Sequence, residues 1–171
     1  MTTVRSKYTN PDFQFVRFRL SSYEFGIDIR NLKEIIKHRE ITAVPGMPSF
    51  IEGFIRLRSM VVPVIDLRKR YALEPVVAEP VRIIIALLNG YIAGLVVDEV
   101  ADITAGRKEL QIKSDGPLAL DDGARPWDEC VEAVIEDGKD SIMIIRLREL
   151  LNPEELSFFK GPMPDAGSMP G

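Results

Sequence analysis

The sequence contains the same order of predicted elements twice. Residues 13–71 read as a strand, a tight serine turn, the segment YEFGIDI and then the hairpin GFIRLRSMVVPVIDL. Residues 81–151 repeat this order as VRIIIALL, an Asn-Gly turn, YIAGLVV and the last hairpin CVEAVIEDGKDSIMII. A duplicated chain has a seam between its matched halves, so we expect function to lie at that seam.

The repeat has two registers. Gly26 corresponds to Gly94 at an offset of 68 residues, whereas Ile65 corresponds to Ile145 at an offset of 80. The difference of 12 residues falls in the loop-like stretch 116–126. The extra residues therefore lengthen a connection and leave the repeated strands intact.

The residue pattern predicts a mostly β protein with a few short helices. FQFVRFRL alternates along much of its length, as a half-buried strand does, while IIIALL and MVVPVI are apolar on both faces. Many short strands with frequent turns favour barrels or a sandwich. Because each half carries about five strands, we expect two five-stranded barrels packed together. Short helices are predicted in PSFIEG, in LRKRY and in LRELLNPEEL, the last interrupted at Asn152-Pro153.

These elements predict the following domain organisation. Residues 1–12 form a flexible N-terminus and residues 161–171, rich in proline and glycine, a disordered tail. Residues 13–160 form the folded domain, with a first barrel at about 13–74, a second at about 80–152, and chain ends free to cross between them.

Composition narrows the class of protein. The net charge of -4 argues against nucleic-acid binding through the phosphate backbone. One cysteine excludes an internal disulfide and fits a reducing compartment. The N-terminus has no apolar signal region, and the longest apolar runs are too short to span a bilayer. We therefore expect a cytoplasmic protein without direct membrane insertion.

Residues that could perform chemistry are sparse. His38 stands in a charged stretch and reads as a surface histidine, while Cys130 precedes an apolar strand and reads as a small buried side chain. The acidic residues Asp98, Glu99 and Asp102 lack calcium-loop spacing and read as solvated loop residues. No glycine-rich phosphate loop occurs. The sequence predicts no enzyme activity, no metal and no cofactor.

One segment resembles a known family. IEGFIRLRSMVVPVIDLRKRY is similar to the signature of the chemotaxis coupling protein family, CheW. YEFGIDIRNLKEI, TAVPGMP and LVVDEV match that family in the same order, so the resemblance covers about residues 13–156. Two residues depart from it: Arg56 replaces the usual Asn and Ser59 the usual Gly. If that Gly needs positive φ, Ser59 strains the turn by about 1 kcal/mol or more and disturbs the geometry near Arg58.

The resemblance implies two SH3-like barrels and the role of an adaptor. Such proteins bind the cytoplasmic tip of transmembrane chemoreceptors and the regulatory domain of the histidine kinase CheA. They have no chemistry of their own and are recruited to membrane-associated receptor arrays. An apolar groove between two barrels can hold a helical hairpin, with a few charges setting its orientation.

The resemblance also implies site residues. The receptor-binding groove is expected at Leu32, Ile35, Val100 and Ile103, near Ile29 and Val97, with the charged pair Glu34 and Arg58 beside it. Kinase binding is expected at exposed apolar residues at one end of a barrel, and the candidates are Val44, Met47, Phe50 and Ile51. Each apolar residue taken singly reads equally well as core, and the charged pair as an ordinary surface ion pair.

Three other functions stay open on the sequence alone. A small barrel can bind another protein or a nucleic acid, and nucleic-acid binding would require a basic groove. An enzyme would require clustered polar residues in a deep pocket. A coupling protein can also serve a sensory pathway other than swimming.

Overall fold

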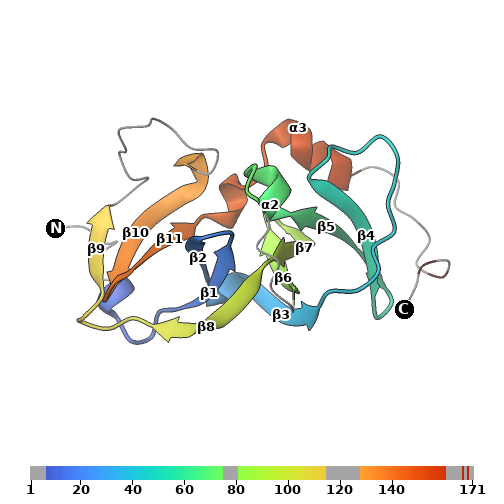
Figure 1. Ribbon diagram of the computed structural model, residues 1–171. Helices are drawn as coiled ribbons and strands as arrows, with labels where there is room; N and C mark the ends of the chain where they lie inside the picture. Colours follow the sequence, from blue (N-terminus) through green and yellow to red (C-terminus); the bar gives the residue numbers. More distant parts are fainter. Residues whose placement is uncertain (1–6, 75–80, 115–127, 161–166, 168, 170–171) are drawn as a thin grey trace.

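The computed structural model describes residues 7–74, 81–114, 128–160, 167 and 169. Within them the strands form a six-stranded and a five-stranded sheet that lie side by side (Figure 1). The mostly β fold class is confirmed. Neither sheet closes on itself through a strand ladder among the described residues, and one sheet has six strands where five were predicted.

The six-stranded sheet, called sheet A, has the order β8-β1-β2-β11-β10-β9. Among the described strands of this sheet, β2 and β11 are the only parallel pair. Its strands are β1 (Gln14–Leu20), β2 (Tyr23–Asp28), β8 (Glu99–Ala105), β9 (Gln111–Ser114), β10 (Val131–Asp137) and β11 (Asp140–Ile145).

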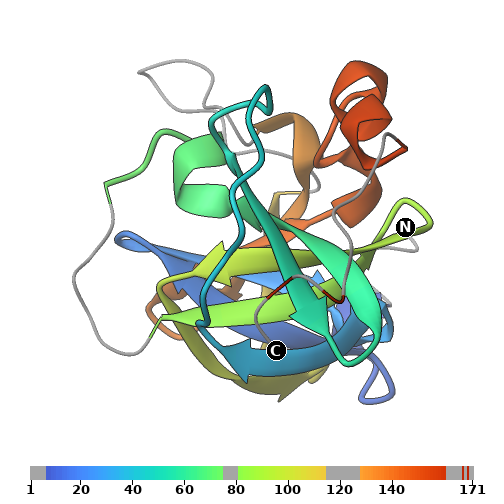
Figure 2. The ribbon, with the colours of Figure 1, turned by 90° about the vertical axis from the view of Figure 1, so that its right-hand side faces the viewer.

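The five-stranded sheet, called sheet B, has the order β3-β6-β7-β5-β4, and it faces the viewer in Figure 2. In the part of the chain that the structure describes, β5 and β7 are the only parallel pair of this sheet. Its strands are β3 (Leu32–Lys37), β4 (Ile51–Leu57), β5 (Met60–Asp66), β6 (Arg82–Leu88) and β7 (Tyr91–Val97).

Each sheet takes strands from both halves of the repeat. Sheet A joins the hairpin β1–β2 to β8–β11, and sheet B joins β3–β5 to the hairpin β6–β7. The strand pairing therefore differs from the predicted division near residues 74–80. The exchange follows from the parallel pairings of β2 with β11 and of β5 with β7, each of which joins a hairpin of one half to a hairpin of the other. Residues 75–80 themselves lie outside the described part of the chain.

The two parallel pairs reproduce both offsets of the repeat. Gly26 of β2 lies opposite Ile144 of β11, and Gly94 of β7 lies opposite Val64 of β5. The glycines differ by 68 positions and their partners by 80. A Cβ at Gly26 would lie 2.9 Å from Ile144 Cδ1, so any larger residue there would have to displace a neighbouring side chain. The two sheets are thus related by a pseudo-twofold axis, which confirms the duplication.

The central core lies between the sheets. It takes Phe18 and Phe25 from sheet A and Ile84 and Leu95 from sheet B, all fully buried. Each curled sheet also has one smaller cluster on its inner side. The cluster of sheet A lies around Ile135, and that of sheet B lies around Ile55 and Ile83. The strands are apolar on both faces because each sheet packs on both sides.

Short helices follow β5 and β11. The helix α2 (Leu67–Arg70) confirms the prediction for LRKRY. Leu147–Glu149 form the 3-10 helix η3, and α3 (Pro153–Leu156) begins after the capping residue Asn152, as the predicted interruption requires. The predicted helix in PSFIEG is wrong, because Ile51 begins β4 and its strand pairs with β5.

The hairpin turns show which residues adopt a left-handed backbone. Asn89 and Gly90 have φ values of 51° and 86°, which confirms the Asn-Gly hairpin. In the β4–β5 turn the positive φ, 57°, belongs to Arg58, and Ser59 is not among the positive-φ residues. The expected strain at Ser59 is therefore corrected: the strained residue is Arg58.

The predictions for the chain ends are only partly testable. Residues 1–6 and most of 161–171 lie outside the described residues. Tyr8 is fully buried in the inner cluster of sheet A, and its hydroxyl donates to Glu132 Oε2 at 2.5 Å. Residues 7–12 are therefore not a flexible leader. In the tail, Met169 is buried, which conflicts with disorder at that residue.

Candidate partner-binding surfaces

The predicted groove residues lie on two edge strands. Among the described residues β3 pairs only with β6, and β8 pairs only with β1. Both strands lie on the lower side of the molecule, where the two sheets meet (Figures 1 and 2). An edge strand leaves one side without a strand neighbour, so this side of the seam is available to a partner.

A bulge in β3 aligns its two predicted groove residues. Leu32 lies opposite Ala86 and Ile35 opposite Ile84, with a register shift between Leu32 and Glu34. Without the bulge, residues three apart would point to opposite faces. With it, both share the face of Ala86 and Ile84, which belongs to the central core.

A bulge in β8 does the same on the other sheet. Val100 lies opposite Phe18 and Ile103 opposite Val16, with a register shift between the two pairings. Phe18 and Val16 also belong to the central core. Leu32 and Val100 differ by 68 positions, as do Ile35 and Ile103, so the pseudo-twofold axis relates the two strands residue by residue.

The central core therefore reaches the surface along the seam. Leu32 and Val100 are partly buried against the core, while Ile35 is 37% exposed and Ile103 is 49% exposed. We call these four residues the seam groove. Val97, named near the groove by sequence reasoning, is fully buried and belongs to the core; Ile29 is partly buried against it.

Glu34 and Arg58 form the expected ion pair. Nη1 of Arg58 donates to Oε2 of Glu34 at 2.7 Å, and this pairing raises the pKa of Arg58. Glu34 lies opposite Ile85, which faces the inner cluster of sheet B. The pair is therefore on the face of β3 opposite Leu32 and Ile35. It ties β3 to the β4–β5 hairpin, which belongs to the other edge of sheet B.

The four residues predicted for kinase binding differ in accessibility. Val44 is partly exposed, and Met47 and Phe50 are partly buried against the central core. The guanidinium of Arg70 lies 5.2 Å from the centre of the Phe50 ring. Ile51 is a buried core residue and does not fit the expectation of an exposed contact. The other three lie on the connection between β3 and β4 or just before β4.

A buried ion network joins the sheets, and sequence reasoning missed it. Arg68 donates from Nη2 to Asp66 Oδ2 at 3.0 Å and from Nη1 to Asp98 Oδ1 at 2.9 Å. The Ser21 backbone N–H donates to Asp98 Oδ2 at 2.7 Å. Hydrogen bonding to Asp66 outweighs burial and, with Asp98, raises the pKa of Arg68. Asp98 is 2% exposed, so its reading as a solvated loop residue is wrong. Its place directly after the apolar run YIAGLVV was the available signal.

The remaining reactive side chains have structural positions. Cys130 is buried, and its sulfur lies 2.9 Å from the Tyr71 hydroxyl. His38 is exposed. Among the residues that the structure describes, no group of three or more His, Cys, Asp or Glu side chains could hold a metal ion. In the same residues no helix is long and apolar enough to cross a membrane.

Comparison with known proteins adds independent findings. A family model for the CheW-like domain matches residues 14–156. The chain is 30% identical over 145 residues to the chemotaxis protein CheW of Klebsiella aerogenes, covering 84% of each chain. It is 32% identical over 143 residues to the chemotaxis protein CheW of Bacillus subtilis, covering 82% of this chain and 88% of the relative.

A solved structure agrees with the fold. The scaffolding protein TtCheW from Thermoanaerobacter tengcongensis superposes with a TM-score of 0.70 at 33% sequence identity. The match covers 84% of this chain and 94% of the crystallised chain. The likeness spans both sheets and therefore includes the seam between them.

Proposed function

Because this chain belongs to the CheW-like domain family, we propose that it couples transmembrane chemoreceptors to a CheA-type histidine kinase as a chemotaxis scaffold. Members of this family are scaffold proteins without catalytic activity, and this chain acts by binding. Its proposed partners are the cytoplasmic tip of a chemoreceptor and the regulatory domain of the kinase. Receptor binding brings the protein to arrays at the membrane.

The observation that carries the receptor proposal is the seam groove. Two of its four aliphatic side chains lie on β3 and two on β8, and all four lie opposite residues of the central core. A helical hairpin presents apolar residues along a stripe, and such a stripe fits an apolar groove between two rigid sheets. The pseudo-twofold relation of β3 and β8 offers similar contacts on both sides of the groove, which suits two antiparallel helices.

The charged pair supports this groove from behind. Glu34 and Arg58 hold the edge strand β3 against the β4–β5 hairpin. Since β3 carries two of the four groove residues, its position decides whether the apolar contacts align. We assign the pair the role of positioning β3 rather than of contacting the receptor.

The kinase contact is proposed at the accessible part of the connection before β4. Val44, Met47 and Phe50 offer apolar side chains there, and none of them belongs to the seam groove. Because the two surfaces are separate, receptor and kinase can bind at the same time. Simultaneous binding is what a coupling function requires.

A reconstituted kinase assay tests this function. Purified kinase, receptor-containing membranes and this chain are combined, and autophosphorylation of the kinase is measured. We expect strong stimulation only when all three are present, and loss of stimulation with Ile35→Asp combined with Ile103→Asp. Met60→Asp, an exposed apolar residue outside the groove, is the matched control. If the chain bound neither receptor nor kinase at micromolar concentrations, the proposal would be overturned.

A further inference from the structure

The pseudo-twofold axis relates the buried ion network to a second site on the seam, where arginines replace its two carboxylates. The offsets of the repeat assign a counterpart to each charged residue of the network: Arg146 for Asp66, Arg148 for Arg68 and Arg30 for Asp98. Asn89 is the counterpart of Ser21, whose backbone N–H binds Asp98. Both carboxylates of the network are thus replaced by arginines.

The counterpart positions line a hollow of about 450 Å³. Arg30, Arg146, Arg148 and Asn89 contribute to its wall, together with Lys7. On the other side of the axis, Arg68 is ion-paired with both Asp66 and Asp98. The hollow is therefore the symmetry counterpart of the site that contains the carboxylates of Asp66 and Asp98.

The two acidic side chains of the hollow are already engaged. Asp28 Oδ2 binds Arg30 Nη2 at 2.7 Å, and Glu132 Oε2 binds Lys7 Nζ at 2.8 Å. Burial raises the pKa of Glu132, but hydrogen bonds from Lys7 and Tyr8 outweigh burial and lower this pKa overall. At Asp28, hydrogen bonds from Arg30 outweigh burial in the same way and lower the pKa of that carboxyl group. Both acids are therefore ionised and paired. Arg146 and Arg148 have no ion pair with any described residue, in a chain whose net charge is -4.

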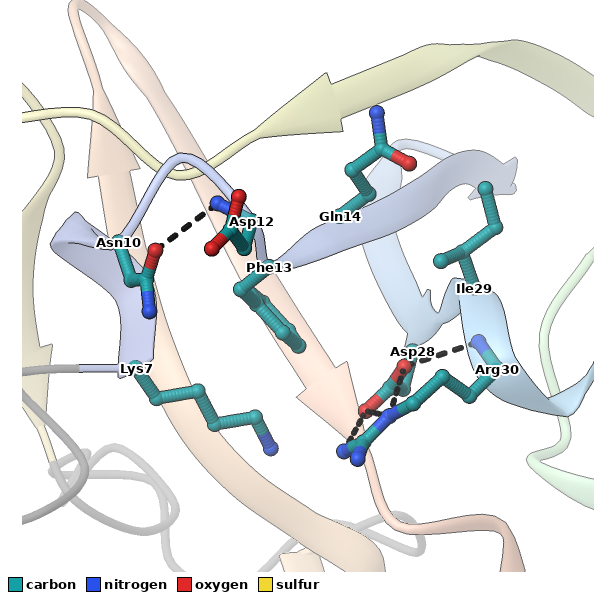
Figure 3. A pocket seen from close by; sticks show the side chains of 8 residues that line it. All are labelled: Lys7, Asn10, Asp12, Phe13, Gln14, Asp28, Ile29 and Arg30. Atoms are coloured by element: carbon teal, nitrogen blue, oxygen red, sulfur yellow. Dashed lines mark hydrogen bonds and ion pairs between the residues drawn. The ribbon is translucent and has the colours of Figure 1, made fainter.

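A second hollow continues the first. It has a volume of about 410 Å³ and shares Lys7, Asp28 and Arg30 with its neighbour. Figure 3 shows the Phe13 ring between Lys7 and the Asp28–Arg30 pair, with Ile29 on the far side. The combined depression, which we call the arginine trough, is apolar near Phe13 and cationic near Arg146. Of the residues expected near receptor binding, only Ile29 lines it.

We propose that the arginine trough binds an acidic, extended peptide segment of a partner protein. Carboxylates of the peptide take the places that Asp66 and Asp98 occupy in the buried network, with Arg146 and Arg148 as donors. Guanidinium groups bind carboxylates through paired N–H donors, which gives orientation as well as affinity. An aliphatic side chain of the peptide packs against Phe13 and Ile29.

The size and charge of the trough select this occupant. Two joined hollows exceed what a single small carboxylate fills, whereas an extended peptide spans both. Nucleic acid binding requires a long track of basic side chains. In the lining of the trough, only the guanidinium groups of Arg146 and Arg148 lack an acidic partner among the described residues. None of the four seam-groove residues lines the trough, so this interaction goes beyond receptor and kinase coupling.

Titration with a synthetic peptide tests the proposal. The probe is the acetylated, amidated peptide ELEELE, and its neutral match is QLQQLQ. Binding is followed by ¹H–¹⁵N spectra of the whole chain. We expect saturable shifts at residues 28–31 and 145–148 with the acidic peptide, weakened by salt, and none with the neutral one. Equal binding of both peptides, shifts confined to other residues, or full saturation of the same amides by acetate alone would overturn the proposal.

A double variant tests the arginines with an arrangement of charges that the fold already contains on the other side of the pseudo-twofold axis. Arg30→Asp with Arg146→Asp recreates the Asp-Arg-Asp arrangement of the buried network around Arg148. We expect peptide affinity to fall at least about tenfold, which corresponds to about 1.4 kcal/mol, while the melting temperature does not fall. Arg19→Asp, an exposed arginine on β1, should leave peptide affinity unchanged. A double variant that folds and retains full peptide affinity would contradict the assignment.

Discussion

The guanidinium of Arg68 and the carboxylate of Asp98 meet at 2.9 Å, at the residue where the chain passes from sheet B to sheet A. Arg68 belongs to α2, which follows β5, and Asp98 separates β7 from β8. The same carboxylate accepts a hydrogen bond from the Ser21 backbone in the β1–β2 turn of sheet A. One buried acid therefore contacts both sheets, and it holds β8 in the position that forms one wall of the seam groove.

Removing the arginine should destabilise the fold strongly. Arg68→Met keeps the aliphatic stem but leaves Asp98 buried without its cation. Loss of one partner of a buried pair costs about 3–5 kcal/mol, so we expect a fall of that order in the free energy of unfolding. Urea denaturation measures it, with Arg19→Met as an exposed control. A loss below about 1 kcal/mol would show that water or other donors satisfy Asp98.

The exposed groove residues should matter for binding more than for folding. Ile35→Asp and Ile103→Asp remove apolar contacts with the receptor, and burial of an isoleucine contributes about 1.5–3 kcal/mol. We expect each variant to weaken receptor binding by about tenfold or more, with little change in melting temperature because both side chains are exposed. Co-sedimentation with receptor membranes measures the affinity. Unchanged affinity in both variants would place the receptor elsewhere.

The Glu34–Arg58 pair should couple to receptor binding through β3. A double-mutant cycle with Glu34→Ala and Arg58→Ala, read out by receptor affinity, should give non-additive losses while kinase binding is retained. The losses arise because a released β3 misplaces Leu32 and Ile35 together. Additive effects with unchanged receptor affinity would reduce the pair to a surface ion pair.

Arg58 offers a further comparison because its φ is 57°. Arg58→Gly and Arg58→Ala both abolish the ion pair, but only glycine adopts this backbone without strain. We expect Arg58→Gly to have the higher melting temperature and both variants to lose the same receptor affinity. Equal melting temperatures would show that the turn changes its backbone conformation in the variants.

Glu132 should make folding sensitive to acid. Burial raises its pKa, but Lys7 and Tyr8 lower it overall below the usual value of 4.5. The unfolded chain therefore takes up this proton first, so the stabilisation is complete above pH 4.5 and is lost as the pH falls through the folded pKa. Glu132→Gln should be less stable at neutral pH, and its difference from the wild type should shrink in acid. A stability difference between Glu132→Gln and the wild type that does not change with pH would contradict this.

The thiol of Cys130 should be inert in the folded protein. Burial raises its pKa, although the hydrogen bond with Tyr71 acts in the opposite direction, and the side chain is only 3% exposed. Because the thiolate is the reactive form, we expect slow reaction with Ellman's reagent in buffer and rapid, stoichiometric reaction in denaturant. Rapid labelling of the native protein would show local opening around η2 (Asp128–Cys130).

Turns and short helices were predicted well because their causes are local. The Asn89-Gly90 turn follows from backbone freedom at two adjacent residues, and α2 and the capped start of α3 follow from their neighbours. The four seam-groove residues were named by resemblance, but the bulges that align them within β3 and β8 were not predicted. Leu32 and Ile35 share a face only because a bulge resets the alternation of β3, and a bulge depends on the partner strand.

The predictions that failed concern contacts between distant segments. Asp98 was read as a solvated acid because Arg68 is its partner only through the packing of α2 against the end of β7. PSFIEG was read as a helix because the pairing of Ile51 with β5 is invisible locally. Tyr8 was placed in a flexible leader because its partner Glu132 lies on β10.

By itself the sequence determined the mostly β fold, the duplication and its offsets, the hairpin turns and the family, because each depends on residue type and spacing along the chain. The tertiary structure alone decided that the halves exchange strands and that the central core reaches the surface along β3 and β8. It also decided that Arg68 pairs with two aspartates on one side of the seam, while Arg146 and Arg148 on the other side have no ion pair with a described residue. These features arise from free energies of burial and charge pairing between segments far apart in the chain, which a linear pattern does not record.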